Sequence, residues 1–262
     1  MEIIAFYLPQ FHPTPHNNEW WGEGFTEWTN VAKARKLFRS HYQPHIPADL
    51  GFYDLRVPEV REQQVKLAKE AGVTGFCYYH YWFGNGKRLL ERPFNEVLNS
   101  GEPDFPFCLC WANQSWYSKF WNNDIECEQK LIVEQEYDNE EWIEKHFYNL
   151  LNAFKDKRYI KVNNKLLFMI YRPLEYPDVK LFMEHWNRLA EKEGLKGFYF
   201  AGQANNDQEA MSIKELGFEG VNIVRKNEYR NKWIYSNVFT KYYYKFQRFL
   251  GKAPYHYDYN KI

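Results

Sequence analysis

Short apolar segments alternate with longer amphipathic segments along most of this chain. The apolar segments are rich in β-branched and aromatic residues, as β-strands are, and they lie at residues 2–8, 73–79, 105–111, 165–171, 197–203 and 218–224. Helical spacing, with proline near several starts and glycine at several ends, predicts helices at 57–72, 87–101, 138–156, 176–194 and 208–217. Residues 9–56 have no such period and are predicted to be a long loop rich in Trp, Pro and His.

A strand followed by a helix, repeated, indicates parallel strands joined by crossover helices. An α/β fold of the (β/α)8 TIM-like barrel type, lacking its last one or two βα units, accounts for the six repeats. A doubly wound sheet is the second alternative. We expect residues 1–224 to form the barrel domain and residues 225–262 to form a basic, aromatic C-terminal segment.

Length and charge narrow the possible functions. A chain of 262 residues is long enough for one α/β barrel. Its 34 Lys and Arg equal its 34 Asp and Glu, which argues against nucleic acid as a partner. A mean hydropathy of -0.71 argues against a transmembrane helix. The N-terminus lacks a basic signal-peptide region, and the four cysteines are read as reduced thiols, so we expect a cytoplasmic protein.

The sequence predicts no cofactor and no metal. Neither GxGxxG nor GxxxxGK[ST] follows a predicted strand, so a dinucleotide site and a P-loop are unsupported. His12 and His16, and likewise His41 and His45, have the four-residue spacing that binds metal on a helix, but both pairs lie in the Pro-rich loop.

Aromatic residues make up 20% of the chain, more than core filling suggests. Many of them follow predicted strands and stand beside amide, imidazole or guanidinium groups, where a barrel builds its site. Rings stack on the C–H face of a sugar, and polar side chains bind its hydroxyls. The candidate sugar-binding residues at these strand ends are Tyr7, Gln10, His12, Tyr79, His80, Trp82, Trp111, Asn113, Gln114, Tyr171, Arg172 and Gln203.

The stretch "WWGEGFTEWTNV" at 20–31 adds three indoles and two carboxylates. Trp20, Trp21, Glu23 and Trp28 are further candidates for sugar binding, and Glu27 is the candidate catalytic acid/base. The two glutamates would lie about 6 Å apart on a helix and about 14 Å apart in an extended chain. That range includes both retaining and inverting glycosidases, so spacing alone assigns no mechanism.

Several long motifs resemble one known family. They are "FYLPQFHP", "WWGEGFTEWTNV", "HYQPHIPADLGFYD", "GFCYYHYWFGNGKRLLERPFNEVL" and "PDFPFCLCWAN", in this order within residues 1–200. The chain is similar in them to the WbsX-type glycosyltransferase family, which resembles glycoside hydrolase family 99. The resemblance implies a (β/α)8 barrel that acts on glycosidic bonds, with a role in lipopolysaccharide, O-antigen or other surface-polysaccharide biosynthesis. Glycoside hydrolysis of the endo-mannosidase kind, and carbohydrate binding without catalysis, are the alternatives.

Two departures from the family pattern favour binding over catalysis. The family's third-strand motif usually reads W-A-N-E, whereas Gln114 stands here in "WANQSW". A glutamine cannot act as a general base. Related chains also carry a late N-E-W-x-E-G-like element, and this chain reaches Ile262 without one, which indicates a fragment or a barrel without its last units.

Residues 225–252 combine aromatic side chains with a net charge of +7. This combination favours peripheral contact with an anionic membrane, where a lipid-linked oligosaccharide substrate would be found. A barrel helix with an exposed basic face is the competing interpretation.

Overall fold

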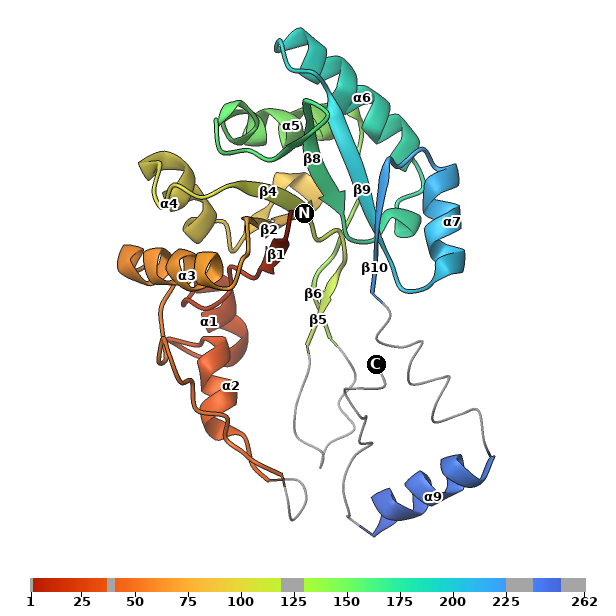
Figure 1. The fold of residues 1–262 in the computed structure, drawn as a ribbon. Helices are drawn as coiled ribbons and strands as arrows, with labels where there is room; N and C mark the ends of the chain where they lie inside the picture. Colours follow the sequence, from red (N-terminus) through yellow and green to blue (C-terminus); the bar gives the residue numbers. More distant parts are fainter. Residues whose placement is uncertain (1, 37–40, 119–129, 225–237, 251–262) are drawn as a thin grey trace.

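The computed structural model describes residues 2–36, 41–118, 130–224 and 238–250. Its centre is a curled sheet of six parallel strands that neighbour each other in chain order (Figure 1). The six strands are β1 (Ile4–Tyr7), β2 (Gly75–Trp82), β4 (Phe107–Trp111), β8 (Lys165–Ile170), β9 (Phe198–Ala204) and β10 (Gly220–Ile223). Two short strands, β3 (Arg88–Leu89) and β7 (Lys161–Val162), pair antiparallel with β2 and β8.

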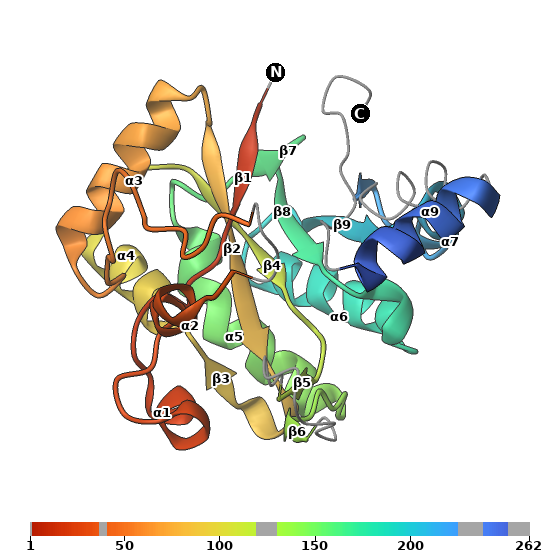
Figure 2. The same ribbon diagram turned by 90° about the horizontal axis from the view of Figure 1, so that it is seen from below.

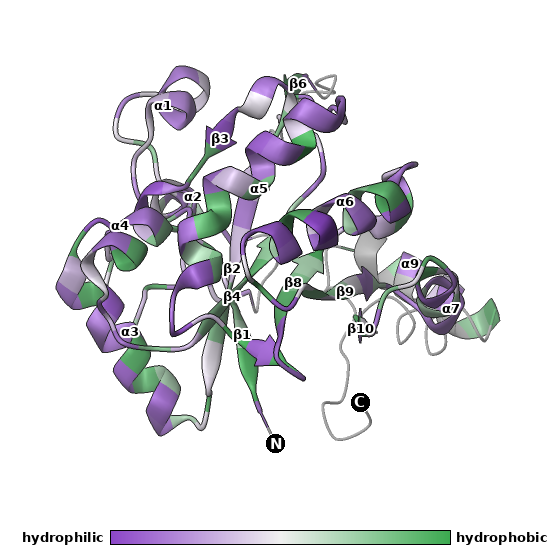
Figure 3. Cartoon of the chain, turned by 90° about the horizontal axis from the view of Figure 1, so that it is seen from above, coloured by the Kyte–Doolittle hydropathy of each residue, from purple (hydrophilic) through white to green (hydrophobic). Residues whose placement is uncertain are grey.

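Helices follow the strands and cover the outer face of the sheet, and hydrophobic and hydrophilic stretches alternate around them (Figure 3). These helices are α3 (Pro58–Glu70), α4 (Arg92–Ser100), α5 (Glu140–Lys155), α6 (Val179–Lys192) and α7 (Asp207–Glu215). A hairpin of β5 (Trp116–Tyr117) and β6 (Leu131–Val133) projects beyond the end of β4 (Figure 2). The remaining elements are α1 (Pro15–Trp21), α2 (Glu27–Lys33), α9 (Val238–Phe249) and the 3-10 turns η1 (Gly84–Gly86) and η2 (Pro173–Glu175).

The predicted parallel α/β architecture is confirmed, because all six strands form where the apolar segments lie. Their sequential order excludes the doubly wound alternative, in which the strand order reverses at a switch point. The fold is consistent with a TIM-like barrel, but among the described residues β1 and β10 remain the two edges of the sheet. The division of the chain at residue 224 stays a prediction.

The predicted long loop at 9–56 is wrong in part, because two seven-residue helices form within it. Thr14 begins α1 by accepting a hydrogen bond from the backbone N–H of Asn17. Gly22, with φ 96, ends α1 in a conformation that favours glycine. The stretch that begins at Trp20 is therefore split between the end of α1 and the start of α2.

An aromatic layer fills the space between the sheet and helices α5 and α6. Trp111 and Trp186 are completely buried in it, and their rings lie 5.0 and 4.9 Å from the ring of His146. The expectation that the aromatic excess serves ligand binding is wrong for these rings, because they fill the core.

Candidate functional site

The two faces of β2 have different neighbours, and this decides which side chains can reach a ligand. His80 points to the helix layer, where its Nε2 lies 2.9 Å from the Nε2 of His146 on α5. Successive residues of a strand point to opposite faces, so Tyr79 and Tyr81 point to the inner, concave face. The carboxyl ends of these parallel strands form the mouth of the fold.

Half-buried polar side chains gather on the inner face near this mouth. The rings of Tyr79 and Tyr171 meet edge to face with 5.9 Å between their centroids. On the neighbouring strands, the Asn222 side chain donates to the Gln203 side chain at 3.5 Å. Three predicted residues, Tyr79, Tyr171 and Gln203, thus share one face with Tyr81 and Asn222, which alternation along the strands could have identified.

Glu27 is the carboxyl that stands out chemically. It is half-buried as the first residue of α2, and it has neither a hydrogen bond nor an ion pair with any described residue. Burial raises the pKa of the Glu27 carboxyl above its ordinary value. The pKa of Tyr81 is raised chiefly by burial, and the charge of Glu27 is the smallest of several further causes, which places the two side chains within electrostatic reach.

Other shifted carboxyls in the described part of the chain behave in the opposite way. Four of them have a pKa below the ordinary value, and each accepts hydrogen bonds: Asp54, Glu96, Asp156 and Glu209. A carboxyl that holds its proton more tightly than usual suits a general acid. We therefore keep the acid/base role of Glu27 as a proposal, and the raised pKa of its carboxyl is the physical reason for it.

Four predicted sugar-binding residues face the helix layer instead of the mouth. Trp82 lies flat against His146, with ring centroids 4.8 Å apart and planes 5° apart. The indole of Trp111 donates to the carbonyl of Trp82 at 3.1 Å, and the Tyr7 hydroxyl donates to the Gln64 side chain at 2.6 Å. The stacking or hydroxyl-binding role that the sequence suggested for Tyr7, His80, Trp82 and Trp111 is wrong in this conformation, because their side chains are buried against the helices.

Asn113 and Arg172 are brought together, but the Asn113 amide is used within the protein. Its Oδ1 accepts from the backbone N–H of Arg172 at 2.7 Å, and its Nδ2 donates to the Arg172 carbonyl and the Tyr137 hydroxyl. The amide joins the end of β4 to the end of β8. Asn113 therefore holds these two strand ends together at the mouth, and its amide is not free for the predicted contact with a sugar hydroxyl. The Arg172 guanidinium lies 5.1 Å from the ring centre of Tyr171 and is partly exposed.

The indoles of Trp28 and Trp21 pack against neighbouring aromatic rings. The Trp28 indole donates to the Tyr53 carbonyl at 2.7 Å and packs on Phe11, while Trp21 stacks on Phe25 with centroids 5.2 Å apart.

The remaining predicted residues lie in the segments that precede α3 or follow β4. His12 is buried, whereas Gln10, Trp20 and Gln114 are half-buried, and exposed Glu23 accepts from the Asn18 side chain. Their roles in sugar binding stay predictions.

Neither a metal nor a cofactor can be assigned to the mouth from this geometry. Within the part of the chain that the structure covers, His, Cys, Asp and Glu side chains form no group of three that could hold a metal ion. Cys77, Cys108 and Cys110 are buried free thiols.

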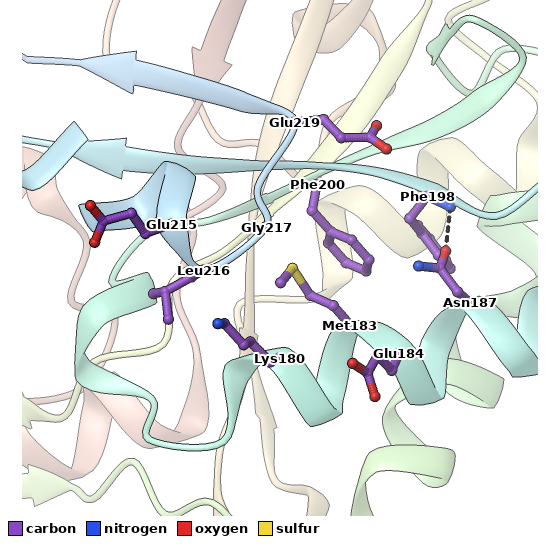
Figure 4. Close-up of a pocket in the computed structure, with 10 residues that line it drawn as sticks. All are labelled: Lys180, Met183, Glu184, Asn187, Phe198, Phe200, Glu215, Leu216, Gly217 and Glu219. Atoms are coloured by element: carbon purple, nitrogen blue, oxygen red, sulfur yellow. Dashed lines mark hydrogen bonds between the residues drawn. The ribbon is translucent and has the colours of Figure 1, made fainter. Parts of the chain in front are cut away.

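A pocket of about 360 Å³ lies away from the mouth, between α6 and the turn from α7 to β10 (Figure 4). Met183, Phe198 and Phe200 form its apolar floor, while Lys180 and Glu184 stand at its rim. Phe198 begins β9, so this pocket is at the amino end of the strands. Because parallel α/β folds build their sites at the carboxyl ends, we assign the site to the mouth.

Comparison with solved structures defines the class of fold. A GH99 endo-α-mannosidase from Bacteroides thetaiotaomicron is similar with a TM-score of 0.52 and 14% identity, covering 96% of this chain and 67% of that chain. A glycoside hydrolase-like protein is similar with a TM-score of 0.50 and 14% identity, covering 96% and 68%. The fold is thus of the α/β kind seen in glycoside hydrolase family 99.

The family follows from the sequence as a whole. Residues 3–262 match the family Glycosyltransferase WbsX, and this chain belongs to that family. Proteins named WxcX from two strains of Xanthomonas campestris pv. campestris, which are uncharacterized, are 38% identical to it over 199 residues. The matched region is 76% of this chain and 28% of each relative, so the chain spans under a third of their length. The predicted family resemblance is confirmed.

Proposed function

We propose that this protein forms or rearranges glycosidic bonds during the assembly of a bacterial surface polysaccharide, such as lipopolysaccharide or O-antigen. The observation that carries the proposal is the half-buried carboxyl of Glu27 near the mouth, which has a raised pKa and no hydrogen-bond or ion-pair partner in the part of the chain that the structure describes. Membership of the WbsX family supports a saccharide as the substrate.

The proposed roles follow the positions of the side chains at the mouth. Protonated Glu27 donates its proton to the oxygen that leaves the anomeric carbon, and the resulting carboxylate accepts the proton of the incoming hydroxyl. Tyr79 and Tyr171 offer ring surface and hydroxyls to the sugar, and Gln203 offers an amide. Arg172 binds a further hydroxyl or an anionic substituent.

The test replaces Glu27 with glutamine and offers a panel of α-linked manno- and gluco-oligosaccharides as donors. Glu27→Gln should lose turnover at least 100-fold while it keeps the native Kd, because the amide preserves shape and removes the proton. Glu62→Gln is the matched control, since that exposed carboxyl lies on α3, away from the mouth, and should leave turnover within twofold. Native turnover by Glu27→Gln would refute the proposed role.

The same panel of oligosaccharides distinguishes the proposed transfer from two alternatives, hydrolysis and binding without catalysis. Hydrolysis with water as acceptor would give free reducing sugar whether or not an alcohol acceptor is added, whereas transfer needs the acceptor. Tight binding of a glycan without turnover in either condition identifies a carbohydrate-binding protein, which Gln114 favours.

We also propose that the C-terminal segment contacts an anionic membrane. Residues 225–237 and 251–252 of the predicted basic segment lie outside the described residues, but α9 is described and carries exposed Tyr242, Phe246 and Lys245. Exposed rings beside a cation suit the surface of anionic lipid. None of the helices in the described ranges is long and apolar enough to cross a membrane.

Liposome flotation tests the membrane contact. The protein should float with vesicles that contain phosphatidylglycerol and not with pure phosphatidylcholine, and 0.5 M salt should release it. Replacing Tyr242 and Phe246 by serine should reduce flotation. Equal flotation with both vesicle types would refute the contact.

A further inference from the structure

Trp116 is an aromatic side chain at the mouth that the helix layer does not cover. It begins β5, five residues after β4 ends, and it is only partly buried. Tyr81 and Phe83 meet its indole edge to face at 5.1 and 5.5 Å, which fixes the ring beside the inner face of β2. Tyr81 in turn lies within electrostatic reach of Glu27.

Two buried polar atoms have no hydrogen-bond partner among the described residues: one lies beside this indole, and the other is two residues past Val133, the residue that pairs with Trp116. One is Nε2 of His16, whose ring centre lies 6.2 Å from that of Trp116. The other is Oε1 of Gln135, a residue whose backbone N–H donates to the side chain of Ser115, next to Trp116. Buried polar atoms in folded proteins are nearly always paired, so an unpaired one indicates a water or a ligand.

The orientation and charge of these groups define what they can bind. The Gln135 Nε2 donates to the Glu136 carbonyl at 3.1 Å, so its Oε1 is left as an acceptor. Burial, and then the charge of Lys87, lowers the pKa of His16, so its imidazole is neutral at pH 7. A neutral imidazole and an amide oxygen bind hydroxyls, and neither carries a charge of its own that would bind a phosphate.

We propose that Trp116, His16 and Gln135 form a second saccharide position next to Glu27, which binds a neutral sugar residue of an oligosaccharide. The indole stacks on the C–H face of that sugar, and His16 and Gln135 bind its hydroxyls. This inference rests on the proposed function, since it extends the Glu27 site by one sugar. In this proposal Trp116, His16 and Gln135 determine how long a substrate the protein binds. The proton transfer is still carried out by Glu27.

Binding of manno-oligosaccharides of one to four residues tests the inference. Isothermal titration calorimetry is performed on Trp116→Ala, Trp116→Phe and Tyr117→Ala, each in the native and the Glu27→Gln background. Trp116→Ala should weaken the binding of the longer ligands about tenfold, the scale of one lost aromatic stack, and should leave the monosaccharide unchanged. Trp116→Phe should restore most of the loss because it keeps a ring.

Tyr117→Ala is the matched control, because Tyr117 is the next residue of the same short strand and its ring is exposed. The melting temperature of each variant shows whether a loss reflects unfolding, and equal loss at every ligand length marks a merely structural effect. Affinities for long ligands that are equal in Trp116→Ala and Tyr117→Ala would overturn the inference while the Glu27 proposal stands. Full turnover in Glu27→Gln with length-dependent loss in Trp116→Ala would refute the catalytic role and keep the saccharide position. If native protein binds no oligosaccharide of the panel, both proposals fail.

Discussion

The buried histidine pair should make the protein lose stability steeply in mild acid. His80 and His146 are fully enclosed, and burial lowers the pKa of both imidazoles well below 6.5. Below about pH 6.5 the unfolded chain binds a proton at each of these residues, while the folded protein binds neither. Since the unfolded state then holds more protons, stability falls as the pH falls, and above that pH it is level.

The size of the effect follows from the number of protons. Each proton taken up only on unfolding contributes about 1.4 kcal/mol per pH unit, so the pair contributes about 2.7 kcal/mol per unit. His146→Phe fits among the same rings and removes one of these protons. We expect its slope below pH 6 to be smaller than the native slope by about 1.4 kcal/mol per pH unit.

Urea unfolding between pH 5.0 and 7.5 measures both slopes. At pH 7.5 His146→Phe should be less stable by about 1–3 kcal/mol, because Nε2 of His80 loses its partner in the core. Burial also lowers the pKa of His12 and His16, but their contribution is the same in both proteins and cancels in the difference. His45→Gln, at an exposed position, should keep the native slope. Identical slopes for native protein and His146→Phe would refute the reasoning.

Three further predictions concern the mouth and the core beneath it. Asn113→Ala removes three hydrogen bonds and should cost about 2–4 kcal/mol in urea unfolding, whereas Gln114→Ala should stay within about 0.5 kcal/mol of native. Trp111→Phe should lower the free energy of unfolding by about 1–3 kcal/mol and leave saccharide Kd values unchanged, since the indole is in the core; a weakened Kd without a stability loss would contradict that placement. Native turnover should fall as pH rises through the raised pKa of Glu27, and that decline should be absent from the residual activity of Glu27→Gln.

The apolar pattern of the sequence was sufficient to locate the six parallel strands, because the ends of each strand lie within three residues of the predicted ends. Helices α1 and α2 could not be predicted in the same way, since seven residues are too few for a helical period. Closure of the barrel was also beyond the pattern, because it depends on pairing between distant segments.

The site was harder to predict because a parallel strand is buried on both faces. Seven of the eight residues from Gly75 to Trp82 are buried. Strand geometry therefore sorts these residues into two faces, but no alternation of polar and apolar residues shows which of the two faces meets a ligand. The contacts with His146 on α5, more than sixty residues later in the chain, show which face is the outer one. His80 and Trp82 both pack against His146, so they belong to the face that the helices cover. Glu27 was identified from its motif alone, but its raised pKa depends on tertiary burial that the sequence does not display.

A crystal structure of the Glu27→Gln variant with a bound oligosaccharide tests the central claim most directly. We expect the sugar on the inner face at the carboxyl ends of β2, β8 and β9, with the glycosidic oxygen about 3 Å from the amide of residue 27 and the next sugar on Trp116. A saccharide bound in the pocket between α6 and α7, or one that leaves residue 27 in contact only with water, would contradict the account.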